Sequence, residues 1–370
     1  MDAAFAKAAG AHKQEVGNVL VLQYNVADPS LFSVSCTGEI RVVSKKSGQT
    51  ITETYTDLVS ANVSIQADAN TNIKIYGDVT EMIAPQPWGS DPYGLVSINT
   101  KKCTTITQLN IMRSLVTSLD FTGATSLSQL NIASCTGLTA LDLSANTALT
   151  SLSCDNCTGL TSLDLSTNTA LTSIDCIGCT GLTALDLSTN TALTNLSCGD
   201  CTGLTALDLS ANTALTSLSC NNCTGLTALD LSTNTALTNL SCSDCTGLTA
   251  LDLSANTALT SLSCDNCTGL TSLDLSTNTV LTSINCSDCT GLTVLDLSTN
   301  TALTSIDCSD CTGLTSIKYP ATNGVVSTVI ADAITAATAS DGTVYTDSAA
   351  SYYSTIATAA TAKGWTIEQL

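Results

Sequence analysis

Residues 138–159 read Leu-Thr-Ala-Leu-Asp-Leu-Ser-Ala-Asn-Thr-Ala-Leu-Thr-Ser-Leu-Ser-Cys-Asp-Asn-Cys-Thr-Gly, and this stretch decides the fold. Each of its two eleven-residue halves fits one template, L-x-x-L-x-L-x-x-N/C-x-x. Units of this kind recur every eleven residues from Leu138 to Leu314. Close identity returns only every 22 residues, because a D-L-S-x-N unit alternates with an x-C-x-x-C unit. The sequence therefore predicts a coil of 22 residues that repeats along the chain.

The spacing of the apolar residues indicates what one coil would bury. Six side chains of the stretch are expected inside: Leu138, Leu141, Leu143, Leu149, Leu152 and Cys154. A single coil cannot enclose that set, but stacked coils can. At about 4.8 Å a coil, roughly ten coils would form a rod on the order of 50 Å long.

The template resembles that of leucine-rich repeats, and the resemblance covers residues 95–320. The nested 11/22 form is similar to short-period repeats of Bacteroidetes surface proteins and phage proteins. Leucine-rich repeats usually pair a strand with a helix or a looser segment. Here both halves carry the L-x-L core, so we expect a mainly β leucine-rich-repeat β-solenoid with two parallel sheets, one for each half.

The ends of the chain depart from the template. We expect an N-terminal arm over 1–16, a small antiparallel β domain over 17–92, and a cap of strand, helix and strand over 321–370. The repeat extends backwards through Leu127 and Val116, and Leu95 is its first candidate unit. Strands are expected at Val19–Val26, Glu39–Ser44, Thr50–Thr56, Val63–Gln66, Asn72–Tyr76, Gly342–Tyr345 and Trp365–Ile367, with a helix at Ser348–Lys363.

Eight Cys-x-x-Cys pairs run from Cys154/Cys157 to Cys308/Cys311, and this spacing also occurs in zinc and redox sites. The alignment of the units favours another role, since Cys154 occupies the slot that Leu165 fills in the next unit. Buried free cysteine behaves as a small hydrophobe. We expect structural core thiols and no metal, while the coil spacing leaves disulfides between coils open. The first members of this set are Cys154, Cys157, Cys176, Cys179, Cys198 and Cys201.

Two further columns are predicted at the turns of the coil. Asparagine recurs at the ninth slot, beginning with Asn146, Asn168 and Asn190, and its amide is expected to satisfy backbone groups at a tight corner. Glycine recurs at the opposite corner, and a positive φ is expected at Gly137, Gly159 and Gly181. We interpret the asparagine and glycine columns as structural features of the coil.

A column of aspartates points outward, because each member sits between two inward leucines. Stacking would place like charges about 5 Å apart, which is unfavourable unless ions or donors screen them. A solvated, solubilising face is the main interpretation; weak cation binding or docking of a basic partner is the alternative. The members are Asp142, Asp164, Asp186, Asp208, Asp230, Asp252, Asp274 and Asp296.

Charge and composition narrow the partners. The 370 residues carry a formal net charge of −20, which disfavours nucleic acid and anionic membranes. No apolar run approaches the roughly 20 residues of a membrane-spanning helix, and no secretory signal peptide is visible at Met1. The only histidine is His12, and every serine or aspartate of the repeats recurs in each coil. Neither an enzyme nor a cofactor site is therefore expected.

Two functional hypotheses follow, and both describe a protein or glycan binding surface. The first is a phage virion component, a fibre or a head or tail decoration, suggested by the start of the chain at Met1 and by the reduced cysteines. The alternative is a secreted or cell-surface bacterial adhesin, which the repeat resemblance favours. The expected location is accordingly the virion or the cell exterior. The sequence leaves the choice of sheet face and the formation of homo-oligomers open.

Overall fold

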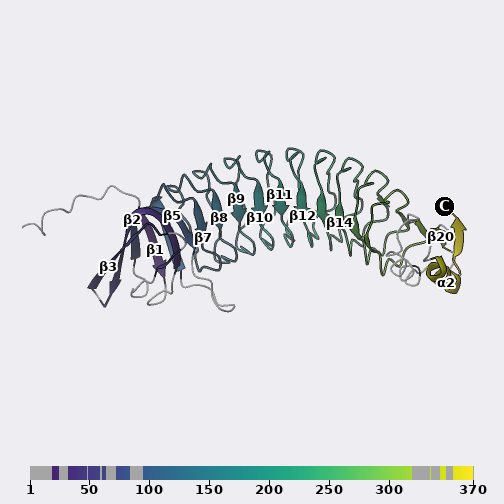
Figure 1. Cartoon of the computed structure of the whole chain (residues 1–370), viewed down its shortest axis with the longest axis horizontal. Helices are drawn as coiled ribbons and strands as arrows, with labels where there is room; N and C mark the ends of the chain where they lie inside the picture. The colour runs from purple at the N-terminus through teal and green to yellow at the C-terminus, as the bar shows by residue number, and fades with distance from the viewer. Residues whose placement is uncertain are drawn as a thin grey trace, which may run out of the picture.

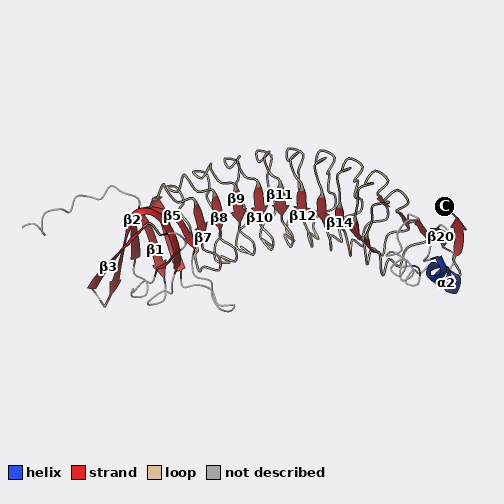
Figure 2. Cartoon of the chain, viewed as in Figure 1, coloured by secondary structure: helices blue, strands red, loops and turns tan. Residues whose placement is uncertain are grey.

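The computed structural model is a curved β-solenoid of stacked coils, with N-terminal strands at one end and a small α/β cap at the other (Figure 1). Strands and loops make up nearly all of it (Figure 2). None of the described helical segments has the length and hydrophobicity of a membrane-spanning helix. The structure describes residues 19–24, 32–47, 49–58, 61–63, 72–83, 95–318, 334, 342–346 and 353–369.

The N-terminal strands pair with one another in antiparallel fashion. They are β1 (Val19–Tyr24), β2 (Phe32–Lys46), β3 (Gln49–Thr56), β4 (Ala61–Val63), β5 (Asn72–Ile83) and β6 (Leu95–Lys102). The end of β5 then pairs in parallel with the first solenoid strand, so one sheet runs through both regions. The predicted arm over 1–16 and the proline-rich stretch 85–92 lie outside the described residues.

Leu95 has a double role that the repeat phase alone does not predict. Its strand, β6, pairs antiparallel with β1. The same strand also meets the first coil, through a parallel bridge between Asn99 and Asp120 and a hydrogen bond from the Leu115 N–H to the Leu95 carbonyl. The strand thus joins the N-terminal sheet to the repeats.

A long parallel sheet follows the cysteine-bearing half of the coils. Each of its strands has a buried central residue and pairs in register with the strand one coil away. This register follows from the uniform coil length, because every inward residue must meet its own counterpart. The strands are β7 (Gln108–Asn110), β8 (Gln129–Asn131), β9 (Ser151–Ser153), β10 (Ser173–Asp175), β11 (Asn195–Ser197), β12 (Ser217–Ser219), β13 (Asn239–Ser241), β14 (Ser261–Ser263), β16 (Ser283–Asn285) and β18 (Ser305–Asp307).

The core is a column of leucines and cysteines. Each of the six residues expected inside the first regular coil is buried, and Leu141 is the most exposed of them at 7%. Full burial of one leucine contributes roughly 1.5–3 kcal/mol. Repetition of this set in every coil is the main source of stability, since the chain has few aromatic side chains.

The second parallel sheet exists, but it is confined to the C-terminal end. It comprises β15 (Leu273–Asp274), β17 (Val294–Asp296), β19 (Ser316–Lys318), β20 (Thr343–Thr346) and β21 (Thr366–Gln369). In the earlier coils the aspartate half has no strand ladder, although its side chains make the same hydrogen bonds as those of the last coils. The Asp164 carboxylate accepts the Ser166 N–H, and the Leu143 carbonyl accepts an amide hydrogen of Asn168.

The asparagine column links successive coils from inside. Asn212 is fully buried, and its Nδ2 donates to the Asn190 carbonyl at 2.9 Å and to the Leu187 carbonyl at 3.1 Å. The other regular members repeat this pattern. The Oδ1 atoms are buried and have no hydrogen-bond partner among the described residues. The Nδ2 donor of each amide, rather than its Oδ1 acceptor, therefore bonds the coils to one another at this corner.

The prediction of a positive φ at the repeated glycines is wrong. Gly137, Gly159 and Gly181 keep negative φ values, and a Cβ on Gly159 would lie 2.7 Å from the Leu138 carbonyl oxygen of the neighbouring coil. Close approach of two coils, not backbone conformation, requires glycine here. The left-handed turn instead falls between the paired cysteines, where asparagine and aspartate tolerate it. Its residues include Asn156, Gly178, Asp200, Asn222, Asp244 and Asn266.

The variant Gly225→Ala tests this explanation. Its Cβ would lie 2.7 Å from the Leu204 carbonyl oxygen, so two coils must move apart and the free energy of unfolding should fall by about 1–3 kcal/mol. The matched control is Gly178→Asn, which places at the left-handed turn a residue that other coils carry there. Thermal unfolding followed by circular dichroism should show a loss for the first variant only. Equal melting of Gly225→Ala and the parent chain would contradict the close-approach explanation.

The C-terminal cap extends the second sheet. Helix α2 (Tyr353–Lys363) buries Ile356 and Ala360, and it ends at Gly364, whose φ is 82°. Strands β20 and β21 add in parallel beyond β19, so the sheet continues into the cap. Residues 319–333, 335–341 and 347–352 lie outside the described part, so the cap predicted over 321–370 stays a prediction.

Candidate functional site

The outward side chains of the long sheet form a surface that we call the sheet face. Two rows run along it, because the first and third residues of each three-residue strand point outward. The first row begins at Glu81 and continues with Gln108, Gln129, Ser151, Ser173, Asn195, Ser217, Asn239, Ser261, Ser283 and Ser305. The second begins at Ile83 and continues with Asn110, Asn131, Ser153, Asp175, Ser197, Ser219, Ser241, Ser263, Asn285 and Asp307.

The sheet face is polar and carries little charge. Glu81, Asp175 and Asp307 are its only ionisable members, although the whole chain has a net charge of −20. The stacking of the coils makes the sheet face about 50 Å long, and its three-residue strands make it about 10 Å wide.

The N-terminal end of this face is hollowed into a shallow groove of about 270 Å³, which we call the amide groove. Its floor is the backbone of β5, β7 and β8, whose central residues are buried. The polar side chains that line it are Glu81, Gln108, Asn110, Gln129, Asn131, Ser151 and Ser153. Elsewhere on the face the rows hold serine, asparagine and aspartate, so the paired glutamines distinguish this end.

The groove residues on β5, β7 and β8 are absent from the sequence-based predictions. The usable signal is the tripeptide Gln-Leu-Asn, which occurs at 108–110 and again at 129–131, where the regular coils carry Ser/Asn-x-Ser/Asp/Asn. A departure from a near-identical repeat marks a position where packing does not dictate the residue. The link to Glu81 is not visible in the sequence, because it depends on the parallel pairing of β5 with β7.

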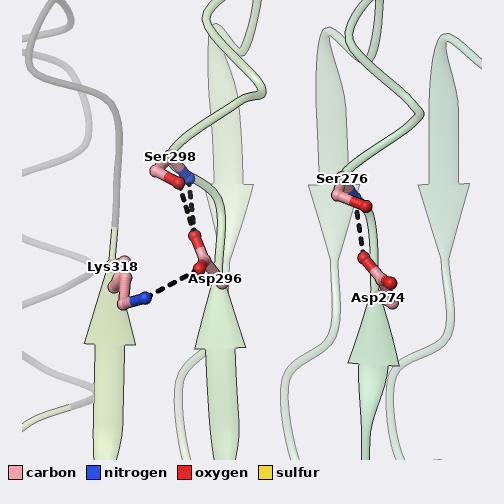
Figure 3. A network of polar contacts seen from close by, with 5 residues as sticks. All are labelled: Asp274, Ser276, Asp296, Ser298 and Lys318. Atoms are coloured by element: carbon pink, nitrogen blue, oxygen red, sulfur yellow. Dashed lines mark hydrogen bonds and ion pairs between the residues drawn. The ribbon is translucent and has the colours of Figure 1, made fainter.

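The aspartate column lies on the other side of the coil and is exposed, as its sequence position indicates. Each aspartate bonds to the serine two residues on: the Ser276 N–H donates to the Asp274 carboxylate at 2.9 Å (Figure 3). Backbone and hydroxyl groups of that serine hold the pKa of the Asp274 carboxyl below its ordinary value. The local donors therefore stabilise the charged column in part.

Asp296 is the member with a cationic partner. The Lys318 Nζ lies 3.1 Å from its carboxylate (Figure 3). Lys318 also lies over the Tyr345 ring. Partial burial by itself raises the pKa of Asp296, but bonds from Ser298 and Lys318 outweigh that effect and the pKa is lowered. This ion pair lies at the C-terminal end of the aspartate column, next to Tyr345 of the cap.

The cysteines form a buried ladder that mirrors the asparagine column. The Sγ of Cys223 donates to the Cys198 carbonyl at 3.1 Å, and Cys245 donates to Cys220 in the same way one coil on. The donor lies 25 residues after its acceptor, as in the asparagine column. The cysteine thiols at one corner and the asparagine amides at the other thus make equivalent hydrogen bonds to carbonyls of the previous coil. All 19 cysteines lie within the described ranges, where they are buried and free.

Side-chain hydrogen bonds between cysteines lower the pKa of Cys201, Cys245 and Cys289, whereas the acidity of other thiols is governed by burial. Burial raises the pKa of Cys103 and Cys135 to about 11 and that of Cys157 to about 12. A thiol with such a pKa holds little thiolate at neutral pH, and thiolate is the form that attacks electrophiles and binds metals. Across the described residues, no three histidine, cysteine, aspartate or glutamate side chains are grouped to hold a metal ion.

Comparison with known proteins gives two structural likenesses. No protein-family model and no curated protein matches the chain. The chain is similar to the functional domain of InlJ from Listeria monocytogenes, described as including a cysteine ladder, with 26% identity, a TM-score of 0.49, and coverage of 76% of this chain and 72% of InlJ. It is also similar to an internalin, InlF, from Listeria monocytogenes strain 4b F2365, with 18% identity, a TM-score of 0.48, and coverage of 78% and 86%. The repeats and the sheet pairing of this chain establish its leucine-rich β-solenoid architecture without these likenesses.

Proposed function

We propose that this chain is a non-catalytic binding protein that presents its sheet face to a partner. The observation that carries the proposal is the continuity of that face: two rows of neutral polar side chains keep one register along the solenoid. The interior is held by leucines and by the cysteine and asparagine ladders. The outward residues are therefore free of a packing role and can be devoted to recognition.

The sheet face is better suited to this role than the aspartate face. Partners that approach the aspartate column must compensate a row of like charges, whereas the sheet face imposes no such electrostatic requirement. The aspartates also have hydrogen-bond partners in their own turns, as between Asp208 and Ser210. We assign the aspartate column to solubility and to the prevention of self-association, with cation binding as its secondary candidate role.

A catalytic role has little support from the geometry. An active site needs a unique constellation of groups, whereas the serines and aspartates of the coils recur with the same neighbours. The one histidine, His12, lies outside the described residues. The part of the chain that the structure describes offers no metal-binding group to replace it.

We place this binding function on a cell surface or in the secreted fraction, as an adhesin-type protein. The resemblance of the 11/22 repeat to bacterial surface repeats supports this setting. The virion hypothesis depended largely on the first residues of the chain, and residues 1–18 lie outside the described part. Nothing in the described residues favours a virion component over an adhesin.

The proposal is tested by matched charge insertions on the two faces. The sheet-face variant is Asn195→Arg with Asn239→Arg, and the control is Ser210→Arg with Ser232→Arg on the aspartate face; all four positions are exposed. Fluorescent full-length protein is titrated onto epithelial cells, bacterial cells and mucin-coated plates. We expect saturable binding to at least one surface, reduced at least tenfold by the sheet-face variant alone. Absence of saturable binding, or equal loss with the control, would overturn the proposal.

A further inference from the structure

The amide groove differs from the rest of the sheet face in how its polar groups are used. The Oδ1 of Asn110 accepts the Met112 N–H at 3.2 Å, and the Oδ1 of Asn131 accepts the Ala133 N–H at 3.0 Å. Each bond fixes the orientation of its amide plane. The Nδ2 groups have no acceptor within the described part of the chain, so two oriented NH₂ donors stand on adjacent strands.

Further along the face, comparable groups are consumed by neighbours. The Ser241 hydroxyl donates to Asn221, and the Ser263 hydroxyl donates to Asp265. The Asn285 amide is bonded at both ends, by donation to Asp265 and by acceptance from Ser287. The Asn195 and Asn239 amides also accept one hydrogen bond, from Thr194 and Thr238. The N-terminal end is therefore distinguished by the grouping of four amides and one carboxylate in a single groove.

The glutamine row supplies further donors and acceptors. The carboxamides of Gln108 and Gln129 make no hydrogen bond with any residue that the structure describes, and both are exposed. Beside them stands Glu81, whose carboxylate is positioned by the Ser35 hydroxyl at 2.6 Å. One carboxylate, two free amides and two oriented amides thus converge on a groove of about 270 Å³.

We propose that the amide groove binds a neutral oligosaccharide through its hydroxyl groups. Each sugar hydroxyl is both a donor and an acceptor, so a mixed array of amides and one carboxylate can engage several of them at once. The groove volume is close to the lower end of small-molecule sites, which suits a short segment of a glycan. This inference deepens the proposed function and rests on it, because it names the ligand class for one end of the sheet face.

The chemistry of the groove disfavours the other ligands. A peptide that adds as a strand needs a free sheet edge, but β7 and β8 are paired on both sides. A helical or proline-rich peptide needs several apolar or aromatic anchors, whereas the outward residues of these two strands are all amides and Ile83 is the one outward apolar residue of the groove. An anionic glycan would meet Glu81 and the field of a chain with a net charge of −20.

The test uses Asn131→Asp in the full chain. This change keeps the oxygen that accepts the Ala133 N–H but replaces the NH₂ donor with an acceptor. Neutral tetrasaccharides of glucose, mannose and galactose are titrated by calorimetry and by saturation-transfer NMR. We expect at least one to bind the parent chain and to bind the variant about tenfold more weakly, as two lost hydrogen bonds imply. The control is Asn222→Asp, which makes the same charge change at the left-handed turn, outside the two rows of the sheet face, where other coils carry aspartate; it should bind like the parent.

A second variant, Gln129→Met, changes only an exposed carboxamide and should also weaken binding if Asn131→Asp proves too unstable to assay. Failure of every neutral glycan to bind, equal loss with Asn222→Asp, or binding of an unstructured peptide at Asn131 would overturn the inference. If cell-surface binding remains sensitive to the Asn195 and Asn239 arginine variant in that case, the proposed function stands. If no neutral glycan binds and the arginine variant of Asn195 and Asn239 leaves cell-surface binding unchanged, the inference and the proposed function are both overturned.

Discussion

Asn212→Asp is expected to destabilise the middle of the solenoid by about 3–5 kcal/mol at pH 7, because it leaves a buried charge without a partner. The parent amide donates to the carbonyls of Leu187 and Asn190, and it is fully buried. A carboxylate in its place would face those two oxygens with no hydrogen to offer. In a solenoid each coil contacts only its neighbours, so the loss should be local.

The pH dependence of this variant has a definite sign. Burial raises the folded-state pKa of the new carboxyl above its ordinary value of about 3.9, so the native state retains the proton longer. Its stability relative to the parent is therefore highest below pH of about 4 and falls as the pH rises through the folded-state pKa. The protonated carboxyl can still donate one hydrogen bond, which accounts for the recovery in acid.

The matched control is Asn195→Asp, an exposed position with the same change in charge. Thermal unfolding of both variants and the parent between pH 3 and 8 should show a loss that grows with pH for Asn212→Asp only. Hydrogen exchange should place the opening in the coils that flank residue 212. A flat pH dependence, or an equal loss in the control, would contradict the role of the asparagine ladder.

The second expectation concerns the thiols, all of which should be unreactive in the native state. All 19 cysteines are buried and free. Burial raises the pKa of Cys103 and Cys135 to about 11, so their thiolate fractions stay small at pH 8. A disulfide-forming reagent added to native protein should label fewer than about one thiol per chain within minutes. The same reagent in concentrated denaturant should label close to all of them.

A surface thiol provides the control for this measurement. Ser217→Cys adds a cysteine on the sheet face, where Ser217 is partly exposed, and this one thiol should react in the native chain. Denaturation without a reductant is the decisive step. Recovery of few free thiols there would show that disulfides join the coils, and it would contradict the reduced core. Rapid labelling of the native parent would contradict its burial.

Much of the fold can be predicted from the sequence, because the repeat is so regular. Leucine at fixed slots predicts which side chains are buried, and substitution of Cys154 for the leucine of other units indicates a core thiol. The aspartates point outward as strand alternation requires. These features depend on one coil and its identical neighbours, so a one-dimensional pattern contains the information.

Other features depend on contacts between coils or between distant segments. The glycines are required by the carbonyl of the previous coil, as at Gly159 and Leu138, and a sequence pattern cannot distinguish that from a left-handed turn. The second sheet is confined to the last coils, where strands β20 and β21 of the cap extend it, and the repeat alone does not indicate that limit.

The sequence by itself thus determined the coil, its buried column and its two outward faces. Only the tertiary structure decided which polar side chains gather in the amide groove. The amide groove forms because β5, from the N-terminal strands, pairs in parallel with β7 and brings Glu81 beside Gln108. The physical reason is that hydrophobic periodicity fixes which way a side chain points, whereas a binding site depends on which segments pair, and strand pairing is set by the whole fold.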